Sequence, residues 1–259
     1  MTAWGAAKLF HDDAAHVRYA SVYGAGLNEL HRYREALGAL NDAIDTAARN
    51  PDVAYPSIAV ATKIDALRGL NEKKEALALA NTALARIPRG DLYSHYYQLL
   101  TSRGLIYQDQ GDLPHAIADY HAALQDATRI DYWRGVCETS GYLARALGQN
   151  GQLHDALAAV NQAIEANKCI PDELYFLPQN LALKAEITQK LGQPKQAAIL
   201  YKESTTLIDA MLAHAPTSNV ERFVLTELSD VYSCYFASRI QQDDYNGALS
   251  VIEQARGRH

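Results

Sequence analysis

One residue type recurs along this chain at a nearly fixed interval. Its positions, Ala36, Ala76, Ala116, Ala156, Ala197 and Ala248, are 40, 40, 40, 41 and 51 residues apart. Each stands in a similar local sequence, such as Lys73-Lys74-Glu75-Ala76-Leu77 or Leu153-His154-Asp155-Ala156-Leu157. Self-similarity at one period indicates a stack of structural repeats.

Each repeat has the pattern of two helices joined by a tight turn. Positions four and seven after the alanine are mostly apolar or small, as in Val160 and Ala163, and these offsets trace one helical face. Twelve positions before the alanine, small residues such as Gly104 and Ala144 lie in a first helix that a second can approach closely. Five positions before the alanine we expect a left-handed turn, at His31, Asn71, Gly111, Gly151, Gly192 and Asp243.

The ends of the repeats also resemble one another. We expect proline to end one helix and Asp, Ser or Asn to cap the next at Pro51-Asp52, Pro88-Arg89-Gly90-Asp91, Ile130-Asp131, Pro171-Asp172 and Pro216-Thr217-Ser218-Asn219. These boundaries give repeats at about 13–50, 52–88, 91–129, 131–170, 172–215 and 219–259. Because each unit of a stack touches only its neighbours, we expect a single domain over residues 1–259.

These residues resemble the tetratricopeptide repeat. The third copy matches best, with Gly104 in the first helix, Gly111 at the turn, and Ala116, Tyr120 and Ala123 in the second. The period of 40 residues exceeds the ~34 usual for that family and is similar to a long-repeat bacterial type. The resemblance implies an all-α fold, a right-handed superhelical solenoid of about six antiparallel helix hairpins.

Composition and charge indicate the cellular compartment of the protein and exclude some classes of partner. The net charge of −6 argues against a nucleic-acid partner, since phosphates usually demand a basic surface. The first residues lack a secretory signal pattern, and no apolar run is long enough to span a membrane. Three scattered cysteines, Cys137, Cys169 and Cys234, favour a reducing compartment. We therefore expect a cytoplasmic protein that binds neither membranes nor nucleic acid.

No pattern in the sequence indicates catalysis. The histidines and cysteines lack the spacing of metal ligands, and no glycine-rich phosphate loop follows a strand. Cys137 paired with a distant histidine is the one candidate nucleophile, but a small packed thiol is the ordinary occupant of such a helix. We expect a protein that is not an enzyme, binds no metal and needs no cofactor.

Binding is the remaining function, and two sets of residues are candidates for it. In a helical solenoid the first helices line the concave side. The first-helix residues expected to be exposed on that side are Arg18, Asn28, Asp65, Arg68, Gln98, Gln108, Glu138, Arg145, Gln179 and Glu186. Aromatic residues near the repeat boundaries suggest either packing wedges or a row of anchors for a peptide: Tyr93, Tyr96, Tyr97, Tyr132 and Trp133.

The last repeat carries a second resemblance. Residues 248–258 are similar to the final helical repeat before a CHAT domain, a caspase-like protease module. Because the chain stops inside a helical pattern, we expect a fragment of a longer protein, with a catalytic domain following it. The sequence thus predicts a non-catalytic scaffold for a peptide or protein partner, in the regulatory region of a CHAT-domain protease. The alternative is the effector-binding arm of a bacterial transcription regulator or signalling ATPase.

Overall fold

The computed structural model describes residues 12–87, 95–173, 175–215 and 218–256. Within these ranges the ordered elements are α-helices, and the chain divides into two compact units, residues 1–130 and 131–259. The predicted all-α helical repeat fold is therefore confirmed. None of the described helices is both long and apolar enough to cross a lipid bilayer.

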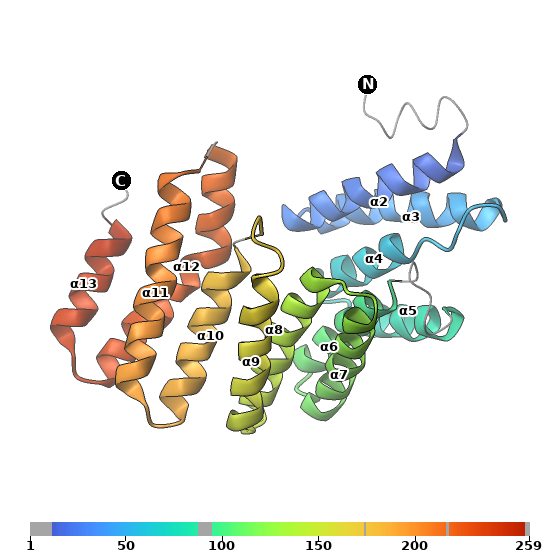
Figure 1. Ribbon diagram of the computed structural model, residues 1–259. Helices are drawn as coiled ribbons and strands as arrows, with labels where there is room; N and C mark the ends of the chain where they lie inside the picture. Colours follow the sequence, from blue (N-terminus) through green and yellow to red (C-terminus); the bar gives the residue numbers. More distant parts are fainter. Residues whose placement is uncertain (1–11, 88–94, 174, 216–217, 257–259) are drawn as a thin grey trace. The chain divides into compact units, whose positions relative to one another are not determined.

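The described residues of the first unit form three helix hairpins (Figure 1). They pair α2 (Asp13–Glu29) with α3 (Tyr33–Arg49), α4 (Ser57–Gly69) with α5 (Lys73–Arg86), and α6 (Tyr96–Asp109) with α7 (Leu113–Arg129).

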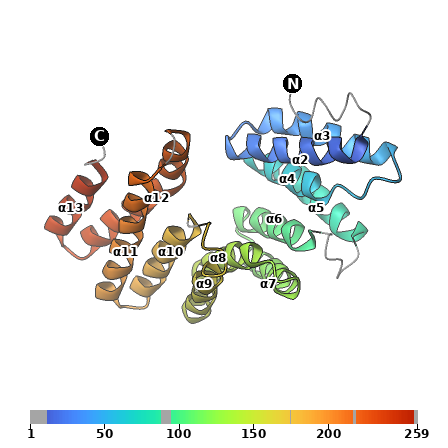
Figure 2. The ribbon, with the colours of Figure 1, turned by 45° about the horizontal axis from the view of Figure 1, so that its top comes forward.

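In the described part of the second unit there are three more hairpins, which follow one another in chain order (Figure 2). They pair α8 (Trp133–Gln149) with α9 (Leu153–Asn167), α10 (Phe176–Lys190) with α11 (Pro194–Ala213), and α12 (Ser218–Gln241) with α13 (Tyr245–Arg256).

The turn inside each hairpin adopts the predicted left-handed backbone. The φ angles are 78°, 79° and 79° at Gly111, Gly151 and Gly192, where glycine carries no penalty. They are 56° at His31, 64° at Asn71 and 56° at Asp243, so three turns accept a side chain in this region. The periodic pattern thus identified all six turns.

The caps predicted between repeats are wrong in most copies. The N-cap residue of α4 is Pro56 rather than Asp52, because the Asn50 Oδ1 accepts from the Asp52 N–H at 3.0 Å and folds a separate turn. Asp131 has a φ of 53° and precedes Tyr132, the N-cap residue of α8, while the N-cap residue of α10 is Tyr175 rather than Asp172. Residues 88–91 and 216–217 lie outside the described residues.

Side-chain caps occur instead at other aspartates. The Asp12 Oδ1 accepts from the Ala15 N–H at 2.9 Å at the start of α2. Asp112, directly after the turn glycine, accepts from the His115 N–H at 3.4 Å at the start of α7.

Small residues set how closely the two helices of a hairpin approach. The six repeating alanines are at most 1 % exposed. A Cβ added to Gly104 would lie 2.6 Å from the Tyr120 ring, and one added to Gly24 would lie 2.5 Å from Leu40. Glycine at these positions therefore lets the large side chain of the second helix pack directly on the first helix.

Successive hairpins contact each other unevenly. Within each unit, the first helix of one hairpin contacts the first helix of the next, in the pairs α2–α4, α4–α6, α8–α10 and α10–α12. The second helices of successive hairpins make no such contact among the described residues. Each unit therefore bends with its first helices on the inner side, and this inner surface is called the first-helix face below.

Candidate functional site

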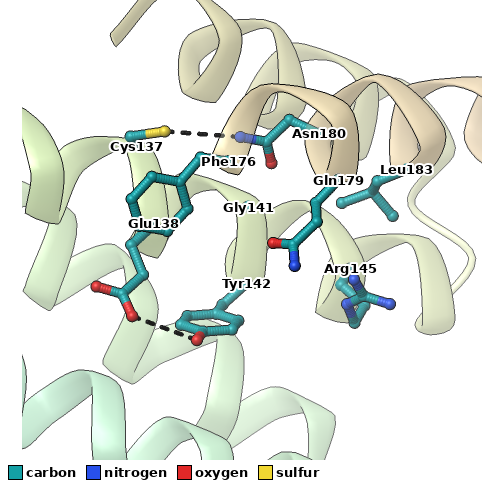
Figure 3. Close-up of a pocket in the computed structure, with 9 residues that line it drawn as sticks. All are labelled: Cys137, Glu138, Gly141, Tyr142, Arg145, Phe176, Gln179, Asn180 and Leu183. Atoms are coloured by element: carbon teal, nitrogen blue, oxygen red, sulfur yellow. Dashed lines mark hydrogen bonds between the residues drawn. The ribbon is translucent and has the colours of Figure 1, made fainter. Parts of the chain in front are cut away.

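A hollow of about 50 Å³ lies on the first-helix face of the second unit, between α8 and α10 (Figure 3). Helix α8 contributes Cys137, Glu138, Gly141, Tyr142 and Arg145, and α10 contributes Phe176, Gln179, Asn180 and Leu183. Small-molecule sites usually have about 300–1,000 Å³. This hollow therefore has room for one side chain of a larger ligand, not for a whole small molecule.

Helical spacing places the α8 side chains on one face. Glu138, Gly141, Tyr142 and Arg145 stand at i, i+3, i+4 and i+7, which are neighbours on a helix surface. A Cβ on Gly141 would lie 2.9 Å from the Asn180 Oδ1, so glycine here allows α10 to approach. The close approach of these two helices forms the floor of the hollow.

The lining combines charged, polar and apolar groups. Tyr142 donates its hydroxyl to the Glu138 Oε1 at 3.3 Å, which holds the carboxylate at one edge. Arg145 is exposed, and Figure 3 shows its guanidinium on the Leu183 side of the hollow. Gln179 adds a carboxamide from α10, and Phe176 supplies a buried ring. A carboxylate, a guanidinium and an amide beside the apolar Phe176 and Leu183 suit the mixed chemistry of a peptide.

Cys137 is one of the buried residues that line this hollow, but its thiol is not activated. Burial raises the pKa of Cys137 to about 12, although the Asn180 amide opposes the shift with a hydrogen bond to the sulfur at 3.6 Å. Nucleophilic cysteines have a lowered pKa, since the thiolate is the reactive species. The protonated thiol therefore argues against the hypothesis of a catalytic Cys137.

The structure brings together three of the four concave-side candidates predicted in this unit. Glu138, Arg145 and Gln179 line the same hollow. Glu186 lies further along α10 and accepts from the Lys190 ammonium at 2.7 Å. The binding role of all four stays a prediction.

In the first unit, most candidate residues bond to protein groups. Asn28 donates to the Thr62 carbonyl at 2.9 Å, and Arg68 pairs with Asp109 at 3.1 Å, so both link successive repeats. Gln108 accepts the Tyr120 hydroxyl at 2.8 Å. Of the other three polar candidates, Gln98 and Asp65 are half-buried and Arg18 is exposed.

Asp65 is the most perturbed candidate in this unit. Burial raises its pKa to about 6, while the Arg68 charge and a hydrogen bond from Ser102 act in the opposite direction. Its Oδ1 is buried and has no hydrogen-bond partner. A carboxylate in such a place destabilises the fold when it is ionised.

The candidate aromatic residues occupy different environments. Tyr97 is 8 % exposed and Tyr96 is half-buried, which matches a packing role for Tyr97. Tyr132 and Trp133 are 38 % and 40 % exposed at the start of α8. Tyr93 lies outside the described residues.

Several residues that line the hollow were absent from the predicted binding set. Gly141 and Tyr142 follow Glu138 by three and four positions, so the same helical projection would have found them. Phe176 and Leu183 stand three positions before and four positions after Gln179, so projection along α10 would have found them too. Asn180 gave no such signal, because its place depends on how closely α10 approaches α8.

Solved structures of low sequence identity share this fold. BtubC (BKLC) from P. vanneervenii is 12 % identical with a TM-score of 0.64, and the match covers 93 % of this chain and 90 % of that one. PlcR of Bacillus thuringiensis in its apo form is 18 % identical with a TM-score of 0.61, covering 84 % and 80 %. The tetratricopeptide protein TTC0263 of Thermus thermophilus is 19 % identical with a TM-score of 0.51, covering 82 % and 98 %.

No protein-family model and no curated protein matches the sequence. The hairpin geometry and the structural likeness nevertheless agree on the architecture. This chain has the fold of a tetratricopeptide-type helical repeat protein.

Proposed function

We propose that this protein is a non-catalytic scaffold that binds a peptide or protein segment along the first-helix face of residues 131–259. The observation that carries the proposal is the hollow between α8 and α10, which is lined by the charged or polar Glu138, Arg145 and Gln179 together with the apolar Phe176 and Leu183. An extended peptide fits this arrangement, because one of its side chains fills the hollow while its backbone and charges meet the polar rim.

The size of the hollow favours a macromolecular partner over a small inducer. At about 50 Å³ it is several times smaller than a typical small-molecule pocket. The raised pKa of Cys137 supports binding rather than thiol catalysis at the same place. The net charge of −6 supports a partner other than nucleic acid.

The test is a pull-down with the 259-residue chain as bait, comparing two charge reversals. Arg145→Glu changes the rim of the hollow, and Lys195→Glu changes an exposed residue on α11, a second helix. We expect Arg145→Glu to reduce recovery of the partner at least tenfold and Lys195→Glu to leave it unchanged, with equal melting temperatures. Full recovery with Arg145→Glu would contradict a binding site at the hollow.

As a finer proposal, the scaffold is the recruiting region of a bacterial, cytoplasmic CHAT-domain protease. The similarity of residues 248–258 to the repeat before such a module supports this, and three free cysteines agree with a reducing compartment. The alternative is the effector-binding arm of a transcription regulator or signalling ATPase. A caspase-like His/Cys pair in the downstream reading frame would favour the protease, and a helix-turn-helix or P-loop sequence the regulator.

A further inference from the structure

Helix α2 presents apolar side chains at positions that are covered in later repeats. Tyr19 is 41 % exposed and Val22 is 63 % exposed. The residues 40 positions further on, Ala59 and Thr62, are at most 5 % exposed. Ala59 is covered because it packs in one cluster with residues of α2 and α3, the preceding hairpin. The exposed face of α2 is therefore the kind of surface that a preceding hairpin covers.

The opposite end of the chain has the complementary surface. A hollow of about 360 Å³ lies between α12 and α13, and its lining is mainly apolar and aromatic. The lining residues are Tyr232, Ser233, Phe236, Val251, Ile252, Ala255 and Arg256.

Repeat equivalence shows what normally covers such a hollow. Ile252 and Ala255 stand four and seven positions after Ala248, where inner repeats place Leu40 and Ala43, or Val160 and Ala163. Those four inner residues are 0 % exposed, whereas Ile252 and Ala255 are only half-buried. In the inner repeats the first helix of the following hairpin packs on this surface, as α4 does on α3 and α10 does on α9.

We propose that α2 of a second copy of this chain docks in the hollow between α12 and α13, so that copies associate head to tail. The two exposed surfaces are the two halves of one kind of repeat junction. The bulky, exposed Tyr19, Val22 and Tyr23 of α2 match a wide hollow, whereas Ala59 fills the tightly packed junction between α4 and α2.

Such a contact joins different surfaces on the two partners. It therefore leaves one α2 face and one hollow free after each association, and the assembly grows with concentration instead of stopping at a symmetric dimer. A segment elsewhere in the same chain that filled the hollow would prevent this growth.

The test measures the mass of the 259-residue chain by sedimentation velocity over a hundredfold range of concentration. We expect the mass to rise beyond that of two chains. Val22→Asp places a charge in the exposed apolar face of α2. Ser233→Arg places a long charged side chain at an exposed position that lines the hollow. Each variant alone should be a monomer with an unchanged melting temperature.

The decisive sample is an equal mixture of the two variants. Ser233→Arg keeps its α2 face and Val22→Asp keeps its hollow, so the mixture should form a species of two chains and nothing larger. Ile199→Asp, at a residue 59 % exposed on α11, is the matched control and should assemble like the original chain. A monomer at every concentration, assembly that survives both variants, or a mixture that stays monomeric would overturn the proposal.

Discussion

Arg103 of α6 donates two parallel hydrogen bonds to Asp119 of α7, from Nε to Oδ2 and from Nη2 to Oδ1, both at 2.7 Å. A third bond, from Nη1 to the Asn81 Oδ1 at 2.8 Å, reaches the preceding hairpin. The Asp119 side chain is 9 % exposed, so the pair is largely shielded from water. One guanidinium thus joins three helices.

Replacing Arg103 should therefore destabilise the first unit. Arg103→Ala leaves a largely buried carboxylate without its partner, and we expect a loss of about 3 kcal/mol in the free energy of unfolding by urea. Arg103→Lys keeps the charge but loses the two-pronged geometry, and should cost about 1 kcal/mol. The double variant with Asp119→Ala should cost less than the sum of the single changes. Additive losses would show that the pair contributes nothing as a pair.

Gly104→Ala should destabilise the same hairpin by overpacking. The new methyl group would meet the Tyr120 ring at 2.6 Å, and that ring is fully buried with its hydroxyl bonded to Gln108. We expect a loss of about 1–3 kcal/mol in thermal or urea unfolding. The matched control is Gly38→Ala in the middle of α3, where nothing lies within 4 Å, and it should gain about 0.5–1 kcal/mol. Equal effects of the two changes would contradict this account.

Asp65→Asn should stabilise the protein in a pH-dependent way. Burial raises the pKa of Asp65 to about 6, so the neutral acid is favoured in the folded state, whereas the unfolded chain ionises near pH 4. The contribution of Asp65 to the free energy of unfolding is therefore most favourable below pH ~4, and it is lost as the pH rises through ~6. The variant should gain about 1–3 kcal/mol at pH 7 and almost nothing at pH 4. Asp52→Asn, at an exposed residue, is the control; a gain that is independent of pH would contradict the assignment.

The three thiols should react with an alkylating reagent in a fixed order. Cys169 is exposed and should react first. Cys234 is exposed too, but desolvation raises its pKa, so it should follow more slowly. Cys137 is buried with a pKa of about 12 and should react only after denaturation. Peptide mass spectrometry over time checks the order, and early labelling of Cys137 in the native protein would contradict it.

The architecture was predictable because it depends on period and residue size. A left-handed turn needs a tolerant residue, so Asn71 and Gly111 could be recognised from their distance to the repeating alanines. Helix starts were less predictable. The position of Asp52 suggested a cap, but the neighbouring Asn50 side chain binds its N–H and delays the helix to Ser57.

The candidate site was predictable only in part. Helical projection found Glu138 and Arg145, because residues seven apart share a face whatever the partner helix does. It could not find Asn180, whose place in the hollow depends on its contact with Gly141 of another repeat. Nor could spacing reveal that Asn28 bonds to the Thr62 carbonyl of the neighbouring repeat.

Among the described helices, the contacts within each unit join only those that are one or two elements apart in the chain. A lineage carrying such a protein can therefore gain or lose a whole hairpin by duplicating or deleting about 40 codons, since the new neighbours meet the same kinds of surface as the old ones. The number of hairpins, and with it the length of the repeat array, can change in evolution without any redesign of the packing inside each hairpin.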